Sequence, residues 1–377
     1  MRLLIPSLGF FVYILLSLVL PLPWRPLGKA GAAALALAVC LKYQAYEAFG
    51  GSFFAPDLPR PLLLAMEALY AAAVVLFFLL LLKDALALLL WLGRLAGAPW
   101  RLPFPPAAQA AGLVALALGL GCWGAWQSVR VPGVRTLELE VPGLPAQLDG
   151  FSLVQITDLH IGPLLRGDWL QAVVDRANAL RPDLAVLTGD MVDGLPAAIG
   201  RDLEPLAGLR AAHGVFGVTG NHEYYFHAGE WLPVFARLGV AMLHNEHRVL
   251  SVRGSRLVIA GVPDIQEQRF GGQGPDPAKA LAGAPDAVRI LLDHRPSGAA
   301  AGAAAGAQIQ LSGHTHGGTM FFIRPLIASF NGGHTSGLYD LGGMQLYVSP
   351  GTGIWPGFSC RLGVPAEITR IVLRPAA

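Results

Sequence analysis

The stretch Gln308-Ile-Gln-Leu-Ser-Gly-His-Thr-His-Gly-Gly318 passes from an apolar segment directly into two histidines flanked by glycines. Residues 308–311 are typical of a buried β-strand, and the glycines permit the tight turn that follows it. Four more apolar runs end in the same way, in polar residues: residues 153–157, 184–188, 215–219 and 288–292. Short strands that alternate with helical segments predict an α/β sheet whose strand ends meet at one edge.

The polar segments behind these five runs contain three aspartates, one asparagine and five histidines. They are Asp158-Leu-His160, Gly189-Asp190-Met-Val-Asp193, Gly220-Asn221-His222-Glu223, His294, and the pair His314 and His316. Ligands of open α/β sheets bind at the carboxyl ends of the strands. Imidazoles, carboxylates and one amide suit two divalent cations that share a bridging carboxylate. The sequence therefore predicts a dinuclear metal site.

Taken singly, most of these segments are weak signals. Asp158 and His160 can reach one ion because residues two apart on a strand face the same side, but such pairs are common. An aspartate after a glycine, as at Asp190, is also ordinary turn chemistry. Asn221 is more specific, because a neutral amide oxygen fills a coordination position without adding charge. Histidines outside the ordered set are expected to be ordinary core or surface residues: His213, His227, His244, His247 and His334.

The first 127 residues differ in composition from the rest. The whole chain is 54% hydrophobic with 14% charged residues, and the apolar excess precedes about residue 127. At a rise of about 1.5 Å per residue, four helical stretches approach or cross a ~30 Å hydrocarbon core. They are residues 3–20, 31–41, 62–82 and 107–126. We therefore predict a transmembrane region of about four spans over residues 1–127.

Three or five spans remain alternatives. The stretch 31–41 is short and crosses the bilayer only if Lys42 and the tyrosines after it lie at the membrane interface. Residues 85–92 are typical of an interfacial helix or of a continuation of the preceding one. The first stretch could instead be a cleavable signal peptide, but its length and Pro21 and Pro23 favour an uncleaved helix. With four spans, five basic residues lie on each side. The positive-inside bias therefore leaves the side of the C-terminal domain open.

Charge and cysteine content exclude some classes of function. Residues 128–377 carry 19 basic and 21 acidic side chains, with no basic cluster. We therefore expect no nucleic-acid partner that binds by counterion release. The three cysteines are Cys40, Cys122 and Cys360. Two of them fall in apolar helices, so no disulfide framework is expected. Cysteine content therefore does not indicate whether the domain lies in a reducing or an oxidising compartment.

From residue 128 onward, strands and helices alternate regularly. Residues 128–150 read as a short tether with a first strand at 135–141. Residues 151–377 read as one layered α/β sandwich domain, with helices at 168–180, 203–211 and 230–238, a strand at 240–243, and a hairpin at 249–262 that turns at Gly254-Ser255. Two further strands at 344–348 and 368–373 close the domain, and residues 299–307 form either a loose helix or a loop.

The ordered set D-x-H, G-D-x-x-D, G-N-H-E, H and G-H-x-H resembles that of the calcineurin-like metallophosphoesterases, over about residues 150–373. The segments Ser349-Pro-Gly-Thr-Gly-Ile and Arg361-Leu-Gly-Val-Pro-Ala-Glu-Ile look like the YkuE-type branch of that family. The branch includes membrane-tethered bacterial enzymes, an animal transmembrane protein with a metallophosphoesterase domain, and some UDP-diacylglucosamine pyrophosphatases. The resemblance implies a metal-dependent phosphoric ester hydrolase. We accordingly expect an integral protein of a bacterial inner (cell) membrane.

The resemblance also implies a role for each matching residue. The first metal would be held by Asp158, His160, Asp190 and His316. The second would be held by Asp190, Asn221, His294 and His314. His222 would be the catalytic histidine that faces the substrate, oriented by Asp193. Mn²⁺, Fe and Zn²⁺ all accept such mixed ligands. Asp293, beside His294, either adds negative charge next to the second metal or points to solvent, and we expect the second.

The sequence indicates the substrate less directly than it indicates the metal site. A tether of about eight residues reaches at most about 27 Å, which would hold the site near lipid headgroups. We therefore expect a phosphodiester or pyrophosphate bond, in a lipid-linked substrate such as UDP-diacylglucosamine. Residues 320–323 and Phe330 could line an acyl groove, or could be a core strand and a loop. The alternative function is a membrane sensor or scaffold whose phosphoesterase domain binds metal but is weakly active. A transporter would need charged residues within the spans, and only Glu67 qualifies.

Overall fold

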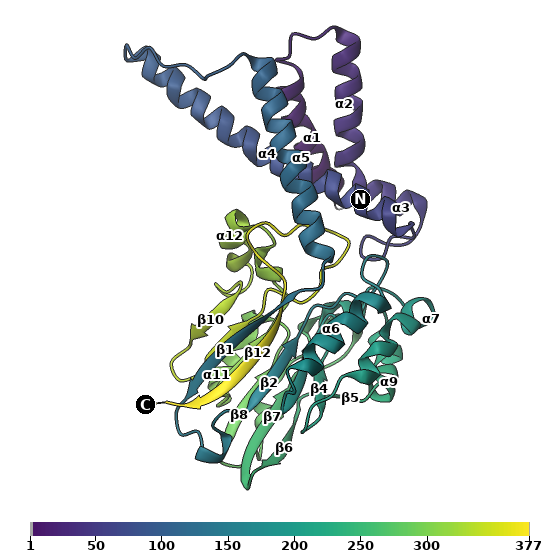
Figure 1. Ribbon diagram of the computed structural model, residues 1–377, viewed down its shortest axis with the longest axis vertical. Helices are drawn as coiled ribbons and strands as arrows, with labels where there is room; N and C mark the ends of the chain where they lie inside the picture. Colours follow the sequence, from purple (N-terminus) through teal and green to yellow (C-terminus); the bar gives the residue numbers. More distant parts are fainter. Residues whose placement is uncertain (1–2, 377) are drawn as a thin grey trace. The chain divides into compact units, whose positions relative to one another are not determined.

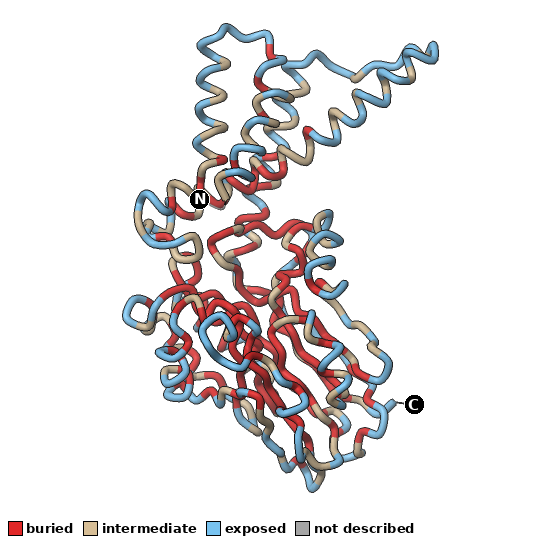
Figure 2. Tube along the Cα trace, turned by 180° about the vertical axis from the view of Figure 1, so that it is seen from behind, coloured by how far each residue is buried: buried red, intermediate tan, exposed pale blue. Residues whose placement is uncertain are grey.

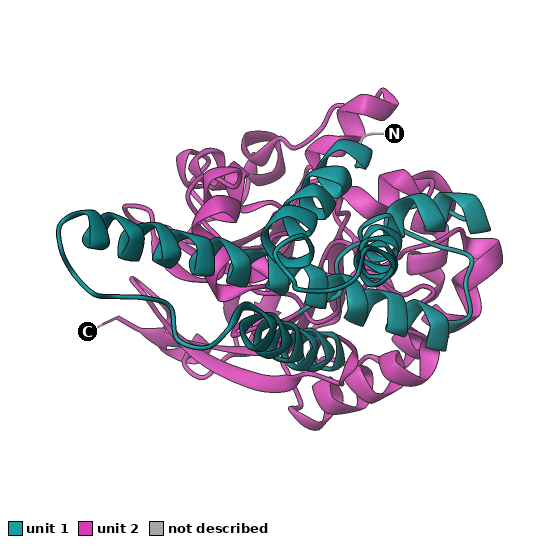
Figure 3. Ribbon diagram, turned by 90° about the horizontal axis from the view of Figure 1, so that it is seen from above, with its two compact units in different colours: residues 1–127, 356–360 teal, residues 128–355, 361–377 magenta. Residues whose placement is uncertain are grey.

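The computed structural model describes residues 3–376, which form two compact units (Figure 3). The helical unit comprises Met1–Gln127 and Pro356–Cys360. The sheet unit comprises Ser128–Trp355 and Arg361–Ala377. The short segment Pro356–Cys360 therefore groups with the helices although the sequence on both sides of it belongs to the sheet unit.

The sheet unit contains two six-stranded sheets. The first is built from β1 (Gly133–Val141), β12 (Glu367–Pro375), β2 (Ser152–Ile156), β3 (Leu184–Thr188), β4 (Val215–Val218) and β5 (Val240–Met242), in that order. The second is built from β10 (Gly337–Asp340), β11 (Gln345–Val348), β9 (Ile309–Ser312), β8 (Val288–Leu292), β7 (Ser255–Gly261) and β6 (Glu246–Val252). Strands β2 to β5 are mutually parallel, as are β7, β8, β9 and β11. In each sheet, the carboxyl ends of neighbouring parallel strands therefore meet at one edge.

The two sheets pack face to face around one apolar core. Val186 and Val218 from the first sheet share a buried cluster with Ile290 and Leu311 from the second. Every residue of β2 and β3 is buried, and the centre of the sheet unit in Figure 2 is correspondingly continuous red. Strands covered on both faces read as unbroken apolar runs, which is why these strands stand out in the sequence.

Short helices cover the outer faces, and Figure 1 shows α6 lying across the first sheet. On the second sheet, Val258 and Leu291 pack with Leu281 of α10 and Ala299 of α11 in a separate apolar cluster. The helices of the unit are α6 (Gly167–Ala179), α7 (Pro196–Ile199), α8 (Asn221–Tyr225), α9 (Ala228–Arg237), α10 (Pro277–Leu281), α11 (Ala299–Ala304) and α12 (Arg324–Ser329). Shorter 3-10 turns are η2 (Ala146–Leu148), η3 (Gly200–Gly208), η4 (Ile265–Phe270), η5 (Pro296–Gly298), η6 (His316–Gly318) and η7 (Phe321–Ile323). The predicted layered α/β sandwich is confirmed.

Two local predictions differ from the structure. Residues 203–211 were expected to form an α-helix, but η3 is a 3-10 helix with Pro205 inside it. A proline has no N–H to donate and clashes with the preceding turn, so a regular α-helix is disfavoured there. Strand β10 and helix α12 were not predicted, because each is short and only partly buried.

The helical unit consists of α1 (Leu4–Ile14), the π-helical turn η1 (Leu15–Val19), α2 (Pro26–Cys40), α3 (Lys42–Phe49), α4 (Arg60–Leu95) and α5 (Pro106–Val129). Within residues 3–376, α4 and α5 are long and apolar enough to cross a bilayer, by length and composition alone. Leu4–Val19 and Pro26–Cys40 are shorter apolar helices. Residues 85–92 continue α4 without a break, so of the two readings of that stretch the structure has the continuing helix.

The acidic residue in the stretch 62–82, Glu67, is buried and paired within the helical unit. Its Oε1 lies 2.8 Å from Nζ of Lys42, and both side chains are almost completely buried. Its Oε2 accepts the backbone N–H of Ser359, and Lys42 also donates to the carbonyl of Gly357. A buried charge is tolerated only when it is paired and hydrogen-bonded. The pair therefore ties Pro356–Cys360 to α3 and α4.

Candidate metal centre

The nine predicted site residues all lie directly behind strands of the sheet unit. Two follow each of β2, β3, β4 and β9, and His294 follows β8. Eight of the nine are buried, while His314 is half-buried. Because β2 to β4 are parallel neighbours, as are β8 and β9, these positions meet at the carboxyl edge of each sheet. The structure thus brings together residues that are up to 158 positions apart in the chain.

The backbone at this edge is unusual. Among the described residues, eleven other than glycine have a positive φ, and five of these are site residues with φ between 47° and 69°. They are Asp158, His160, Asp190, His314 and His316. A left-handed conformation costs an L-residue about 1–2 kcal/mol. It persists where the surrounding structure enforces it, which is characteristic of functional sites.

Glycines let the strand ends approach one another closely. Gly189, with φ of 92°, has so little room that a Cβ there would lie 2.6 Å from His294 Nδ1. A Cβ on Gly220 would collide with the backbone and carboxylate of Asp190. Gly189, before Asp190, and Gly220, before Asn221, are therefore required by the packing of the site itself.

One group of potential ligand atoms contains Asp158, His160 and His316. The Nε2 atoms of His160 and His316 are 3.2 Å apart. Asp158 Oδ1 lies 3.6 Å from His316 Nε2. His160 Nδ1 donates to Asp193 Oδ1 at 3.1 Å, so its Nε2 carries the lone pair in the neutral ring. Ring nitrogens and a carboxylate that converge in this way suit a shared cation.

A second group contains Asp190, His294 and His314. His294 Nδ1 donates to the carbonyl of Thr188 at 2.7 Å, which again leaves Nε2 as the ligand atom of the neutral ring. That Nε2 lies 3.2 Å from Asp190 Oδ2 and 3.2 Å from His314 Nδ1. Asn221 is also buried. The next residue, His222, donates its backbone N–H to Asp190 Oδ1 at 2.8 Å, and this bond keeps Asn221 close to the second group.

One carboxylate oxygen faces both groups. Asp190 Oδ2 lies 3.2 Å from His294 Nε2 in the second group and 3.8 Å from His160 Nε2 in the first. A single oxygen in this position is able to bridge two cations. The donor set of carboxylate, imidazole and amide fits divalent metals such as Mn²⁺, Fe²⁺ and Zn²⁺, and it contains no thiolate.

His222 lies beside these groups and is held by Asp193. Its Nδ1 donates to Asp193 Oδ1 at 2.5 Å, the same oxygen that accepts from His160. Its Nε2 lies 3.9 Å from Asp190 Oδ2. The rings of Tyr225 and Trp355 lie next to it, with centroids 5.3 and 6.3 Å away. The geometry fixes the ring and the tautomer, and it directs Nε2 towards the metal groups.

The carboxylates control the protonation of the histidines. Burial opposes charge on His222, but Asp190 and Asp193 outweigh it and raise its pKa to about 9. Burial is likewise outweighed by Asp190 at His294, whose pKa rises to about 10. At His314 and His316, burial and the neighbouring histidines hold the pKa well below its usual range. The aspartates thus favour the protonated form of His222 and His294, whereas His314 and His316 are held in the neutral form.

The pKa values of the aspartates diverge. Burial raises the pKa of Asp158. Burial also acts to raise the pKa of Asp190, but the nearby His294 and His222 outweigh it and hold the pKa well below the usual range. The pKa of Asp193 is lowered by His160 and His222 against the effect of burial. Asp190 is therefore the acidic group that stays ionised most firmly, as a bridging ligand must.

Three supporting side chains were missed or given no role by sequence reasoning. Glu223 is fully buried and accepts the backbone N–H groups of Asp190, Met191 and Gly220. Arg295 donates from Nε to Asp264 Oδ2 at 2.6 Å and from an NH2 nitrogen to Asn221 Oδ1 at 3.2 Å. Asp264 lies behind β7 as the ligands lie behind their strands, so its position after a strand was an available signal. Arg295 gives no such signal, because its role depends on two distant partners.

The prediction for Asp293 is wrong. Its side chain is buried, and Oδ1 accepts the backbone N–H of Arg295 at 3.1 Å. Burial raises the pKa of this carboxyl to about 7. The β8 end turns inward at this point, where Asp293 Oδ2 closely approaches Gly298.

The other histidines have ordinary partners away from the two ligand groups. His227 pairs with Glu230 on the surface, and His244 pairs with Glu267. His247 donates to the carbonyl of Ala280. None of these belongs to a potential metal-binding group among the described residues.

Comparison with known proteins agrees with this geometry. Residues 151–318 match the family model described as calcineurin-like phosphoesterase. The bovine (Bos taurus) "Transmembrane protein with metallophosphoesterase domain" is 34% identical over 83% of this chain and 74% of its own length. "Uncharacterized metallophosphoesterase YkuE" of Bacillus subtilis (strain 168) is 32% identical over 56% of this chain and 75% of its own length.

Among solved structures, the 5'-nucleotidase precursor from Thermus thermophilus is similar to this chain with a TM-score of 0.38. It is 18% identical, and the match covers 54% of this chain and 49% of the other. A likeness this distant carries no argument about activity. The sequence relatives and the converging ligand groups show that the chain belongs to the calcineurin-like metallophosphoesterase family, whose members are metal-dependent phosphoester hydrolases.

Proposed function

We propose that this protein is a membrane-tethered phosphoesterase that hydrolyses a phosphodiester or pyrophosphate bond, in an amphiphilic substrate such as UDP-diacylglucosamine. The observation that carries the proposal is the shared position of Asp190 Oδ2, between His294 Nε2 at 3.2 Å and His160 Nε2 at 3.8 Å. A bridging carboxylate between two sets of ring nitrogens supports a two-metal site rather than two unrelated ion sites.

In this proposal Asp190 would be shared by two cations. The first would be held by Asp158, His160 and His316, and the second by Asn221, His294 and His314. When bound, the cations would supply Lewis acidity towards the attacking water and the phosphoryl oxygens. Manganese is the metal that we propose to test first.

His222 serves as the proton donor to the leaving oxygen. Its raised pKa, about 9, keeps the ring protonated at neutral pH. Asp193 fixes Nδ1, so the proton available for transfer is the one on Nε2, on the side of the metal groups. A general acid in such a position contributes about 10²–10⁴-fold to the rate.

Arg295 binds the phosphate. Its guanidinium is held by Asp264 on one side and lies 3.2 Å from Asn221 Oδ1, a proposed ligand of the second cation. The side chain remains 25% exposed, so further N–H donors can reach a bound anion. A planar guanidinium suits bidentate contact with two phosphoryl oxygens.

An amphiphilic substrate is supported by apolar side chains next to the metal site. Helix α12 packs on η6, the turn that carries His316. On η7 and α12, Phe321, Leu326 and Phe330 are 62%, 57% and 75% exposed. Large apolar side chains exposed together mark interaction surfaces, and an acyl chain beside the scissile phosphate would cover them. Met320 is fully buried and belongs to the core instead.

The membrane tether is supported by the helical unit. We take residues 1–127 as a membrane region of about four spans, residues 128–150 as the tether with β1, and residues 151–377 as the phosphoesterase domain. Two of the helices are long enough to cross a bilayer, and relatives carry the name of transmembrane proteins. Placement in a bacterial inner membrane is part of the same proposal.

The test is hydrolysis of bis(p-nitrophenyl) phosphate by the detergent-purified full chain, with and without Mn²⁺, followed by UDP-diacylglucosamine in mixed micelles. Asp190→Asn removes the bridging charge, and His222→Ala removes the proton donor. Asp175→Asn, an exposed change on α6, is the matched control. Metal-dependent turnover that both site variants abolish and the control retains would support the proposal.

Two results would contradict it. A metal-loaded protein without turnover of either substrate would favour the sensor or scaffold function. Equal turnover of the water-soluble ester and the lipid, with no gain from micelles, would remove the amphiphilic substrate while leaving the hydrolase in place.

A further inference from the structure

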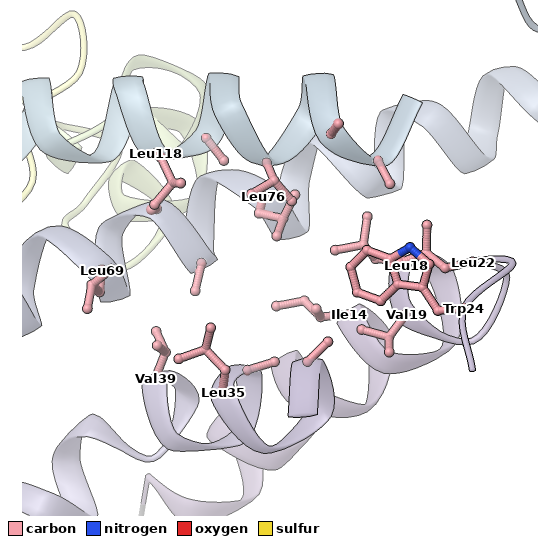
Figure 4. Close-up of a pocket in the computed structure, with 18 of the residues that line it drawn as sticks. Ile14, Leu18, Val19, Leu22, Trp24, Leu35, Val39, Leu69, Leu76 and Leu118 are labelled. Carbon is pink, nitrogen blue, oxygen red and sulfur yellow. The ribbon is translucent and has the colours of Figure 1, made fainter. Parts of the chain in front are cut away.

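A large cavity lies within the helical unit, between α1, α2, α4 and α5 (Figure 4). Its volume is about 470 Å³. This is about three times the ~150 Å³ of an apolar protein cavity that takes up benzene. The space is therefore large enough for a chain of many carbon atoms rather than a single small molecule.

The lining is entirely apolar except for one indole. Every lining residue is alanine, valine, leucine, isoleucine or tryptophan, and Trp24 projects into the cavity in Figure 4. A buried water needs about two to four polar partners, and these walls do not offer them. The occupant must be a hydrocarbon.

Small side chains create the space. Helix α2 presents Ala32, Leu35, Ala36 and Val39 to the cavity, and these positions, spaced three and four apart, lie on one helical face. Alanines also line the cavity from α4 and α5. Alanines on facing membrane helices usually allow the backbones to approach closely. Here they leave an open chamber instead.

The cavity opens to the outer surface of the helices. Several lining side chains are themselves exposed, with Leu35 at 68%, Trp24 at 50% and Leu118 at 41%. Other large apolar side chains of the helical unit, including Ile5 and Leu27, are exposed as well. In a bilayer, the hydrocarbon at such an opening is the acyl chains of the surrounding phospholipids.

A small polar pocket adjoins the chamber. It shares Leu18, Leu22 and Ala110 with the large cavity and is also lined by Lys83 and Gln109. Nζ of Lys83 lies 3.0 Å from Asp84 and donates to the carbonyl of Ser17 at 2.8 Å. Gln109 Nε2 donates to the carbonyls of Pro103 and Phe104 at 3.0 and 2.8 Å. These polar groups have partners within the protein, so the binding surface of the chamber is its apolar wall.

We propose that the chamber between α1, α2, α4 and α5 is a binding site for one acyl chain of a bilayer phospholipid. The site is separate from the phosphoester chemistry and requires only that the helical unit lies in a membrane. A bound acyl chain would account for the space between these helices, whose many alanines would otherwise let them pack in direct contact.

The test uses the full chain in detergent micelles and a phosphatidylcholine whose acyl chain is brominated, a quencher of tryptophan fluorescence. The signal of the site is the quenching that Trp24→Phe removes. Ala36→Phe places a ring in the chamber, whereas Ala38→Phe adds the same ring on the exposed face of α2 and is the matched control. We expect saturable quenching in the parent and in Ala38→Phe, and at least a tenfold weaker apparent affinity in Ala36→Phe.

The melting temperature of each variant provides a folding check that is independent of lipid. A folded Ala36→Phe protein that binds the brominated lipid as tightly as the control would overturn the proposal. So would non-saturable quenching in the parent, or full competition by a detergent without a phospholipid headgroup. Phosphoesterase activity is not part of the readout, so failure here and failure of the hydrolase proposal are distinguishable.

Discussion

Replacing Glu223 with glutamine is expected to destabilise the metal centre, although this carboxylate contacts no ligand side chain. Glu223 Oε2 accepts the backbone N–H groups of Asp190 at 3.0 Å and Gly220 at 2.6 Å. Its Oε1 accepts the N–H of Met191 at 2.6 Å. One buried side chain therefore joins the turn behind β3, which carries the bridging residue, to the turn behind β4.

The size of the effect follows from these three bonds. A glutamine keeps two of them if its oxygen takes the place of Oε2, but its NH2 group then faces the N–H of Met191. A buried donor without an acceptor costs about 1–3 kcal/mol, and losing the charge weakens the two remaining bonds by a further ~0.5–1 kcal/mol each. Burial raises the pKa of Glu223 to about 7, and glutamine avoids that cost of ionisation. That cost is about 3 kcal/mol at pH 8 and offsets most of the loss of about 2–5 kcal/mol, so we expect a net loss of about 1 kcal/mol.

The assay is thermal unfolding of the full chain in detergent with a chelator at pH 8. For a domain of 150–250 residues, a loss of about 1 kcal/mol lowers the melting temperature by roughly 2–4 °C. Metal affinity should fall by about 10–100-fold, as is typical when a group that supports ligands is lost. Glu230→Gln makes the same chemical change on a side chain that is 60% exposed, and we expect it to stay within about 0.5 kcal/mol. A Glu223→Gln protein that melts together with this control would refute the reasoning.

Three further predictions concern neighbouring residues. His222→Ala should lower kcat by about 10²–10⁴-fold with metal content unchanged, and in the parent enzyme kcat should decline above pH 9, where the ring loses its proton; unchanged kcat would exclude it as the acid. Arg295→Lys should raise KM more than it lowers kcat, because an ammonium cannot make the bidentate contact, and an unchanged KM would place the phosphate elsewhere. Asp293 has a folded pKa of about 7 against an ordinary value of 3.8, so its contribution to stability is present below pH 4 and lost as pH rises through 7. Relative to Asp293→Asn, the parent should therefore lose about 2–3 kcal/mol between pH 5 and pH 8 in unfolding experiments, and parallel pH curves would contradict this sign.

The sheet unit was predictable because its chemistry follows its strands. Runs such as residues 184–188 are buried on both faces, so each stands out as an apolar segment with a sharp polar end. The positions of Asp190 and His294 behind such segments then follow from the geometry of parallel strands. The sequence could not show which polar residue at a strand end turns inward. Asp293 is buried because of the local approach to Gly298, which is a tertiary contact.

Supporting contacts were less predictable than the ligands. Glu223 accepts from backbone groups more than thirty residues away, and Arg295, behind β8, joins Asp264 behind β7 to Asn221 behind β4. No local pattern encodes such pairs. In the helical unit, hydropathy located the helices but not their partners, because Lys42 and Glu67 form their ion pair across 25 residues. Composition shows which segments are apolar, whereas only packing shows which polar groups they enclose.

The strain at the metal centre explains why the site requires both sheets. Five proposed ligands hold a left-handed backbone, at a cost of about 1 kcal/mol or more each. Burial raises the pKa of Asp158, and the nearby carboxylate of Asp190 further disfavours its ionisation. A loop on a flexible surface would relax both kinds of strain, but here every loop begins at a strand fixed in the shared core. Cations that bind only the folded site would offset the repulsion and stabilise the fold in proportion to their free concentration. The shared core thus enforces both the left-handed backbone and the convergence of charged side chains that ligation of two cations would require.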